Sequence, residues 1–209
     1  MTAARPRPGG RSARVRAAVL RATIAALVED GVGGLRIEDI AQRAGVNKTS
    51  VYRRWGTREA LLADALLSLS AAEVPVPDEG DVRADLVALA RRIRDAISSP
   101  VGRSIVAAFS SGGRDSDLAD VSRRFWRARF EATGAIVERA VQRGELPPGV
   151  DAQEIIESIA GPVWLRIFGP GEDVDDDRLA RLVDIVVTGI TEGAQEVRGR
   201  EAGSEGATP

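Results

Sequence analysis

One short stretch of the chain, Lys48 to Arg54, concentrates side chains that can bind a polyanion and recognise hydrogen-bonding groups. Read as a helix, it has one plainly apolar residue, Val51, which would face inward. Its outward residues bear hydroxyl groups or positive charge: Lys48, Thr49, Ser50, Arg53 and Arg54. Cations neutralise phosphates, and arginine and hydroxyl groups bond to base edges, so this composition favours contact with DNA. A helix this short needs packing from its neighbours.

The residues just before this stretch predict the support that it needs. The apolar face of a preceding short helix is formed by Ile37, Ile40, Ala41 and Ala44. Gly45 stands where the chain must reverse, a position that favours positive φ, and Asn47 can cap the second helix. The pattern predicts a helix-turn-helix whose second helix would enter the DNA major groove.

This block resembles the N-terminal DNA-binding domain of the TetR (tetracycline repressor-like) family, which often reads IxxIAxxAGVSxxTLYxxFxxKExLL. The matching residues here are Ile37, Ile40, Ala41, Ala44, Gly45, Val46, Asn47, Ser50, Val51, Tyr52, Trp55, Arg58, Glu59, Leu61 and Leu62. A bare helix-turn-helix pattern is a weak signal, but fifteen matched positions in one block near the N-terminus are a strong one. Arg36 stands where the family commonly has a capping Thr, so that cap is predicted to be weaker. Asn47 replaces the usual Ser and keeps the capping ability.

The resemblance implies roles for side chains at the matched positions. Lys48, Tyr52 and Arg58 match positions that commonly hold phosphates, and Arg36 is placed to touch the backbone or a groove edge. The residues predicted to contact bases are Thr49, Ser50 and Arg53. A bidentate bond from Arg53 to guanine would discriminate between bases. The full predicted DNA interface is Arg36, Asn47, Lys48, Thr49, Ser50, Tyr52, Arg53, Arg54 and Arg58.

Composition limits the other functions. A chain of 209 residues allows one or two domains with a sizeable core. It has no Cys and no His, which removes disulfides, thiolate metal sites, the commonest general base and the commonest transition-metal ligand. Without His no catalytic triad can be argued. We therefore expect no catalytic residues, no metal site, no cofactor and no enzyme activity.

The charge is unevenly distributed along the chain. Residues 1–70 carry twelve basic and six acidic side chains, whereas residues 71–209 carry seventeen basic and twenty-five acidic ones. A basic head on an acidic body suits a protein that presents one end to phosphates. The N-terminus lacks an apolar signal-peptide core, and no apolar run reaches the roughly 18 residues of a membrane span. We expect a cytoplasmic protein without membrane contact.

The order of elements predicts an all-α fold: a three-helix helix-turn-helix head followed by a helical body. The predicted domains are a disordered basic arm (1–10), the DNA-binding domain (11–60), an effector-binding and dimerisation domain (61–197) and a disordered tail (198–209). The arm could instead touch the phosphate backbone or the minor groove. About nine helices are expected: 11–30, 37–44, 48–54, 58–72, 81–98, 100–110, 116–143, 151–168 and 175–197.

Large aromatic residues stand out in the predicted body. Trp126 and Phe130 are four residues apart and share one face of a long helix. Plain core packing explains such residues, but TetR-like proteins enclose a ligand cavity in this region. The resemblance therefore implies a small-molecule effector, with candidate wall residues Phe109, Trp126, Phe130, Trp164 and Phe168. The identity of the effector stays open.

The last two predicted helices are apolar over more than half of their surface. Helices this apolar at the end of a chain need more cover than one chain offers, and a symmetric dimer would supply it. TetR-like proteins dimerise in this way. The predicted dimer interface consists of Ile155, Ile159, Val163, Leu179, Leu182, Val183, Val186 and Ile190.

The acidic run from Glu172 to Asp177 has the alternating spacing of a calcium-binding loop. However, Arg178 takes the place of the loop glycine, and Asp184 takes the place of the bidentate glutamate. Capping and dipole compensation at a helix N-terminus explain these acids more simply.

The interpretation that joins these features is a homodimeric regulator, most simply a repressor, released from a palindromic double-stranded DNA operator by a small-molecule effector. A ligand can do this only if it binds more tightly to the conformation in which the two DNA-binding heads are wrongly spaced. Two alternatives remain open at this point: a ligand-independent or activating DNA-binding regulator, and a small-molecule-binding dimer without DNA activity.

Overall fold

The computed structural model describes residues 9–111 and 117–205, and all regular structure within these ranges is α-helical. The ranges contain nine helices, which confirms the predicted all-α class and helix number. The chain divides into two compact units, one formed by Met1–Ala72 and Ser99–Arg127, the other by Glu73–Ser98 and Ala128–Pro209. No helix within the described ranges is both long and apolar enough to cross a lipid bilayer.

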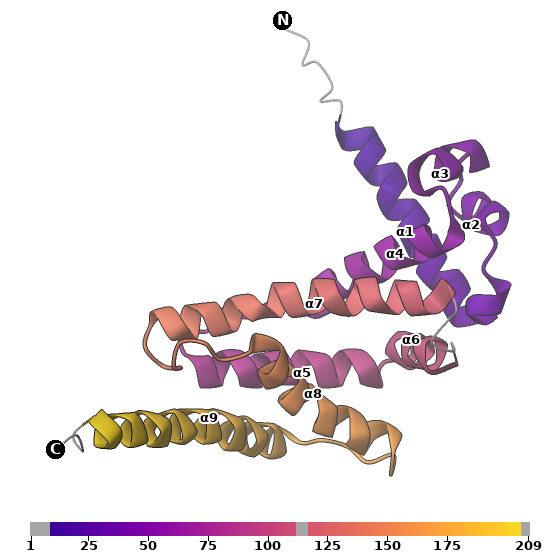
Figure 1. The fold of residues 1–209 in the computed structure, drawn as a ribbon. Coiled ribbons are helices and arrows are strands. Elements are labelled where there is room, and N and C mark those ends of the chain that lie inside the picture. Colours follow the sequence, from indigo (N-terminus) through magenta and orange to yellow (C-terminus); the bar gives the residue numbers. More distant parts are fainter. Residues whose placement is uncertain (1–8, 112–116, 206–209) are drawn as a thin grey trace, which may run out of the picture. The chain divides into compact units, whose positions relative to one another are not determined.

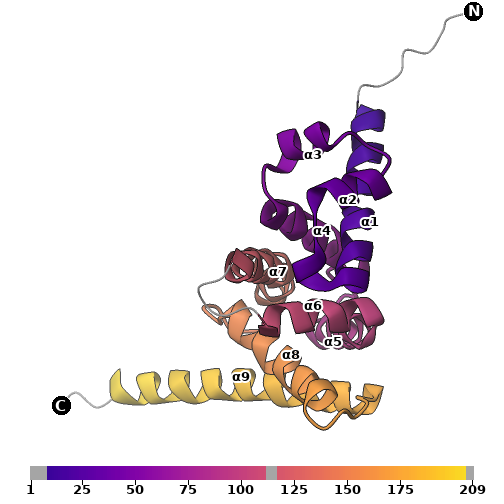
Figure 2. The same cartoon turned by 90° about the vertical axis from the view of Figure 1, so that its right-hand side faces the viewer.

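Unit 1 contains the helix-turn-helix. Its helices are α1 (Gly9–Gly34), α2 (Ile37–Arg43), α3 (Lys48–Trp55), α4 (Arg58–Glu73), α6 (Pro100–Ser111) and the first part of α7 (Asp117–Gln142). α1 packs against α2 and α6, and α2 packs against α3 (Figures 1 and 2). Side chains spaced three and four apart bring one apolar face of each helix to a shared core. Its most buried members include Val19, Leu27, Ile40, Val51, Leu61 and Leu66.

Unit 2 contains α5 (Val82–Ser98), the remainder of α7, α8 (Ala152–Phe168) and α9 (Asp176–Glu205). α5 packs against both α8 and α9, which also contact each other. Asp151 caps the start of α8, since its carboxylate accepts hydrogen bonds from the backbone N–H groups of Gln153 and Glu154. The core of the unit includes Leu86, Leu89, Ile136, Ile159 and Leu179.

Two helix ends differ from the sequence expectation. α1 was expected to stop at Gly31, and this residue does leave the helical conformation, with φ of +65°, but helical turns resume as far as Gly34. α9 continues to Glu205, through the first part of the tail predicted as disordered, because residues 198–205 include several good helix formers. Residues 1–8 of the predicted arm and 206–209 of the tail lie outside the described ranges.

The two compact units divide the chain differently from the predicted domains, which stay a prediction. Residues 99–127 were expected in the effector-binding domain, yet α6 and the first part of α7 belong to unit 1. Ala108 of α6 and Val121 of α7 are buried in the same core as α1 and α4. Unit 1 is therefore larger than the helix-turn-helix head alone.

Candidate nucleic-acid interface

The turn of the helix-turn-helix has the geometry that its sequence predicts. Gly45 adopts φ of +65°, and the next residue, Val46, donates its backbone N–H to Ala41 at 3.0 Å. Asn47 caps α3, because its side-chain oxygen accepts the backbone N–H of Thr49 at 2.9 Å. Arg36 precedes α2 in an extended conformation and makes no side-chain capping bond, as expected for a residue that replaces Thr.

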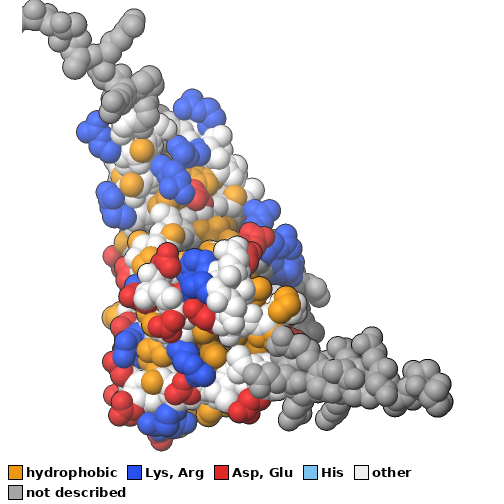
Figure 3. Space-filling model, turned by 90° about the vertical axis from the view of Figure 1, so that its left-hand side faces the viewer, with side chains coloured by type: hydrophobic (Ala, Val, Ile, Leu, Met, Phe, Trp, Pro, Cys, Tyr) orange, Lys and Arg blue, Asp and Glu red, His pale blue; other side chains and the backbone are white. Residues whose placement is uncertain are grey.

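α3 presents a polar surface on an apolar anchor. Val51 is 1% exposed and is the one buried residue of this helix. Ser50 is half-buried, and the exposed residues of the helix are Lys48, Thr49, Tyr52, Arg53 and Arg54. On the face drawn in Figure 3, Lys and Arg side chains predominate over the end of unit 1 that carries α1 and α3. Hydroxyl groups and cations on one short, anchored helix are suited to a DNA groove.

A chain of polar contacts ties the end of α3 to α4 and α1. The indole Nε1 of Trp55 donates to the Asp64 carboxylate at 2.8 Å. Arg16 on α1 forms an ion pair with the same carboxylate, with its Nε 3.2 Å from Oδ2. Arg54 lies over the Trp55 ring, 5.4 Å from the centroid, and donates to the Ser12 hydroxyl at 3.2 Å. These contacts hold α3 in place, and α3 carries the residues predicted to contact bases.

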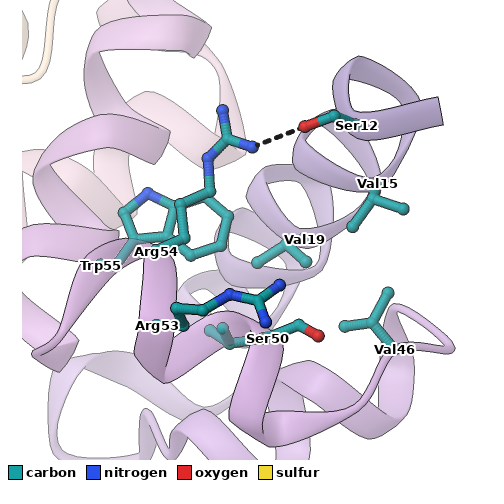
Figure 4. A pocket seen from close by; sticks show the side chains of 9 residues that line it. Ser12, Val15, Val19, Val46, Ser50, Arg53, Arg54 and Trp55 are labelled. Atoms are coloured by element: carbon teal, nitrogen blue, oxygen red, sulfur yellow. Dashed lines mark hydrogen bonds between the residues drawn. The ribbon is translucent and has the colours of Figure 1, made fainter. Parts of the chain in front are cut away.

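A groove of about 590 Å³ runs between α1 and α3 (Figure 4). Its lining residues are Ser12, Val15, Val19, Val46, Ser50, Val51, Arg53, Arg54 and Trp55. Figure 4 shows the Arg54 guanidinium turned toward Ser12 of α1, whereas the Arg53 guanidinium extends on its own over the groove. The two adjacent arginines, both predicted to contact DNA, thus differ: Arg54 is bonded to Ser12, and Arg53 extends over the groove.

Tyr52 makes a contact that the sequence did not predict. Its hydroxyl donates to Oε1 of Glu38 on α2 at 3.2 Å. This bond raises the pKa of Tyr52 above its ordinary value, because it stabilises the protonated phenol. The pKa of Glu38 is lowered by its own backbone N–H, then by Tyr52 and by the charges of Lys48 and Arg36. One predicted DNA contact, Tyr52, therefore bonds to this carboxylate, and the charges of two others, Lys48 and Arg36, act on it.

Arg58 lies at the start of α4 and is not among the residues that act on Glu38. Its Nε donates to the adjacent Glu59 at 2.8 Å, and the side chain is half-buried. Thr57 caps α4, because its hydroxyl accepts the backbone N–H of Ala60 at 3.1 Å. A phosphate contact by Arg58 would require its guanidinium to share or leave Glu59.

The predicted cavity residues fall into two sets. In unit 1, the Phe125 ring lies 5.6 Å from Phe109 and 5.3 Å from Trp126 between centroids. In unit 2, the rings of Trp164 and Phe168 are 5.2 Å apart, and Phe130 packs against the core of that unit. Trp126 and Trp164 are 46% and 43% exposed, so part of each side chain lies outside the core.

The predicted dimer residues differ in how deeply they are buried within one chain. Five of the eight are buried in the core of their own unit: Ile155, Ile159, Val163, Leu179 and Val183. These side chains have almost no surface to offer a second chain, because the apolar faces that they form are covered by α5 and α7 of the same protein. Leu182, Val186 and Ile190 are half-buried. Among the residues of α8 and α9 whose burial is described, which end at Gly193, the exposed large apolar side chains are Trp164, Leu165 and Ile185.

The acidic run before α9 is used for capping and ion pairing. Asp175 accepts the backbone N–H of Arg178 at 2.7 Å, and Asp176 lies 2.7 Å from Arg94 and 3.1 Å from Arg91. These contacts lower the pKa of Asp176, chiefly through the hydrogen bond from Arg94. Asp175 thus caps the start of α9, as the capping interpretation predicted, and Asp176 forms ion pairs there.

Comparisons with known proteins agree with this geometry. A model of bacterial regulatory proteins of the tetR family matches residues 19–65, and a model of the tetracyclin repressor-like C-terminal domain matches residues 76–186. The chain is 38% identical over 189 residues to the HTH-type transcriptional regulator AqdR of Rhodococcus erythropolis, covering 90% of this chain and 91% of AqdR. It is 31% identical over 176 residues to the DNA-binding transcriptional repressor TetR of Mycobacteroides abscessus, covering 82% of this chain and 90% of that protein.

A solved structure supports the same family assignment. The TetR family transcription regulator SCO0332 matches with a TM-score of 0.68 at 32% identity, over 85% of this chain and 98% of SCO0332. The similarity spans both the helix-turn-helix and the helical body, and the relatives are transcriptional regulators, not enzymes. The chain therefore belongs to the TetR family of DNA-binding transcriptional regulators.

Proposed function

We propose that the protein is a homodimeric transcriptional repressor that binds a palindromic operator and leaves it when a small molecule binds. The observation that carries the proposal is the polar surface of α3, held by buried Val51 and by the Trp55–Asp64 bond. Repression is supported by the 31% identity to the Mycobacteroides abscessus protein, which is named as a repressor.

In this proposal, one set of residues in the head holds the DNA backbone, and another set recognises the bases. Lys48, Tyr52 and Arg58 hold phosphates, which fixes the register of the protein but carries no sequence information. Arg53 reads a guanine, because its guanidinium extends over the open groove instead of bonding within the head. Thr49 and Ser50 lie on the same short helix and complete the base contacts. Arg54 acts as an internal support, since it bonds Ser12 and covers Trp55.

The dimer would form through the apolar surface that α8 and α9 leave exposed. Leu165 is 63% exposed and Ile185 is 71% exposed, although both stand on helices whose other faces are buried. Exposed side chains of this size on two neighbouring helices are suited to a symmetric interface. Two copies would then present two α3 helices to half-sites about one DNA turn apart, roughly 34–36 Å, or a near multiple.

The effector would occupy the helical body and change the separation of the two heads. The candidate cavity residues Phe109, Trp126, Phe130, Trp164 and Phe168 are aromatic, and the exposed faces of Trp126 and Trp164 could contact a ligand. Binding weakens operator affinity only to the extent that the effector prefers the released conformation.

A footprint on the DNA upstream of the gene and its divergent neighbour tests the proposal. We expect protection of an inverted repeat, and lower reporter expression when the protein is supplied with that site. Protection of a single asymmetric half-site would contradict the dimeric arrangement. Increased reporter expression from the same site would contradict repression while leaving DNA binding intact.

A further inference from the structure

The Tyr52–Glu38 bond places a carboxylate inside the proposed phosphate-binding surface. Tyr52 is 43% exposed, so its hydroxyl is open to an external partner as well as to Glu38. Glu38 is itself exposed and stands in the first turn of α2. A negative charge in this position opposes an approaching phosphate, and its presence requires an explanation.

A phenol hydroxyl has one proton to donate, and both a carboxylate and a phosphate oxygen can only accept it. While Tyr52 donates to Glu38, it cannot donate to DNA. The same carboxylate attracts the charges of Lys48 and Arg36, two further residues of the proposed interface. A phosphate that takes the Tyr52 proton must therefore break the hydrogen bond to Glu38, beside an anion that also attracts two nearby cations.

We propose that Glu38 is a further functional residue of the DNA interface, an intramolecular competitor of the DNA backbone that limits affinity for DNA of any sequence. The inference rests on the phosphate-binding role proposed above for Tyr52. Its effect falls on the electrostatic part of binding, which supplies nearly all of the affinity for unrelated sequences. A regulator limited in this way spends less time on unrelated DNA, and it dissociates more readily from its operator.

The chain offers a direct reporter for this bond, because Tyr52 is its single tyrosine. Phenolate absorbance in an alkaline titration therefore follows Tyr52 alone. Glu38→Ala should lower the pKa of Tyr52 toward the ordinary value, since the hydrogen bond and the charge that raise it are both removed. Asp39→Ala is the matched control: it removes the same charge from the same first turn of α2 and keeps the bond to Tyr52.

Affinity for an operator duplex and for an unrelated duplex should be measured at one salt concentration. We expect Glu38→Ala to tighten both by about 1.5-fold to fivefold, the range of a single exposed charged contact, and to exceed the gain from Asp39→Ala. In a Tyr52→Phe background, the gain from Glu38→Ala should shrink to that from Asp39→Ala. Thermal melting of each variant confirms that the comparison is made between folded proteins.

The outcomes separate this inference from the proposed function. If Tyr52→Phe weakens DNA binding but Glu38→Ala gives no gain beyond that of Asp39→Ala, the competitor role is overturned and the phosphate role of Tyr52 stands. If Glu38→Ala alters the preferred base sequence, Glu38 reads bases and the inference is likewise wrong. If Tyr52→Phe leaves the affinity unchanged, the proposed phosphate contact fails, and the inference fails with it.

Discussion

The indole nitrogen of Trp55 donates a 2.8 Å hydrogen bond to Asp64, which joins the last residue of α3 to the middle of α4. The same carboxylate pairs with Arg16, so α1, α3 and α4 meet at one acid. Because α3 has a single buried residue, its orientation depends on contacts of this kind. Asp64 therefore positions α3, although it is not among the residues proposed to contact DNA.

Replacing Asp64 should loosen α3. Asp64→Ala removes the acceptor of Trp55 and the partner of Arg16, and we expect it to lower the free energy of unfolding by about 1–2 kcal/mol. Urea unfolding followed by circular dichroism measures this loss. Asp120→Ala provides the control, because Asp120 is largely exposed and pairs with Arg123 one turn away, a contact worth about 0.5 kcal/mol or less. Equal losses for the two variants would contradict a positioning role for Asp64.

The dimer should depend on exposed and not on buried apolar residues. Ile185→Arg places a charge on the exposed surface of α9, so it should yield a folded monomer where the wild type is a dimer. Val183→Arg, two residues earlier, buries an unpaired charge in the core of unit 2. It should cost about 4 kcal/mol or more and unfold the chain.

Sedimentation velocity gives the oligomeric state, and circular dichroism gives the helical content. A wild-type protein that is monomeric at micromolar concentration would defeat the proposal. A dimeric Ile185→Arg variant would place the interface elsewhere.

The aromatic residues of the proposed cavity should report on effector binding. Of the chain's three tryptophans, Trp126 and Trp164 are the exposed pair, and Trp55 is held in the head. An effector that releases the protein from DNA should change their fluorescence, which Trp126→Phe and Trp164→Phe would assign. We expect Ala truncation of at least two among Phe109, Trp126, Phe130 and Trp164 to alter the effector response. If every truncation lowers stability and leaves that response unchanged, these residues are core and the cavity lies elsewhere.

The helix-turn-helix could be predicted because its determinants are local. Gly45 and Asn47 act within a few residues of themselves, and both adopt the predicted conformation or bond. The contacts of Tyr52 and Trp55 could not be predicted in the same way. Glu38 precedes Tyr52 by fourteen residues, and Asp64 follows Trp55 by nine on a different helix, so the helical repeat within one segment predicts neither pair.

The dimer residues show another limit of the sequence. α8 and α9 are apolar over so much of their surface that periodicity cannot distinguish the face against α5 from a face against a second chain. Val183 and Ile185 are both apolar and two residues apart, yet one is fully buried and the other is 71% exposed. Only the packing of the other helices separates them.

Selection of bound duplexes from a random library, with the wild-type protein and with Arg53→Ala and Lys48→Ala, tests the central claim most directly. The wild type should enrich an inverted repeat. Arg53→Ala should lose its preference at one base pair of each half-site, a discrimination of about 1–3 kcal/mol. Lys48→Ala should keep the same preferred sequence, bind every duplex more weakly and reduce the salt dependence by about one counterion per protomer. An altered base preference for Lys48→Ala, beside uniform weakening for Arg53→Ala, would contradict the assignment of reading and positioning on α3.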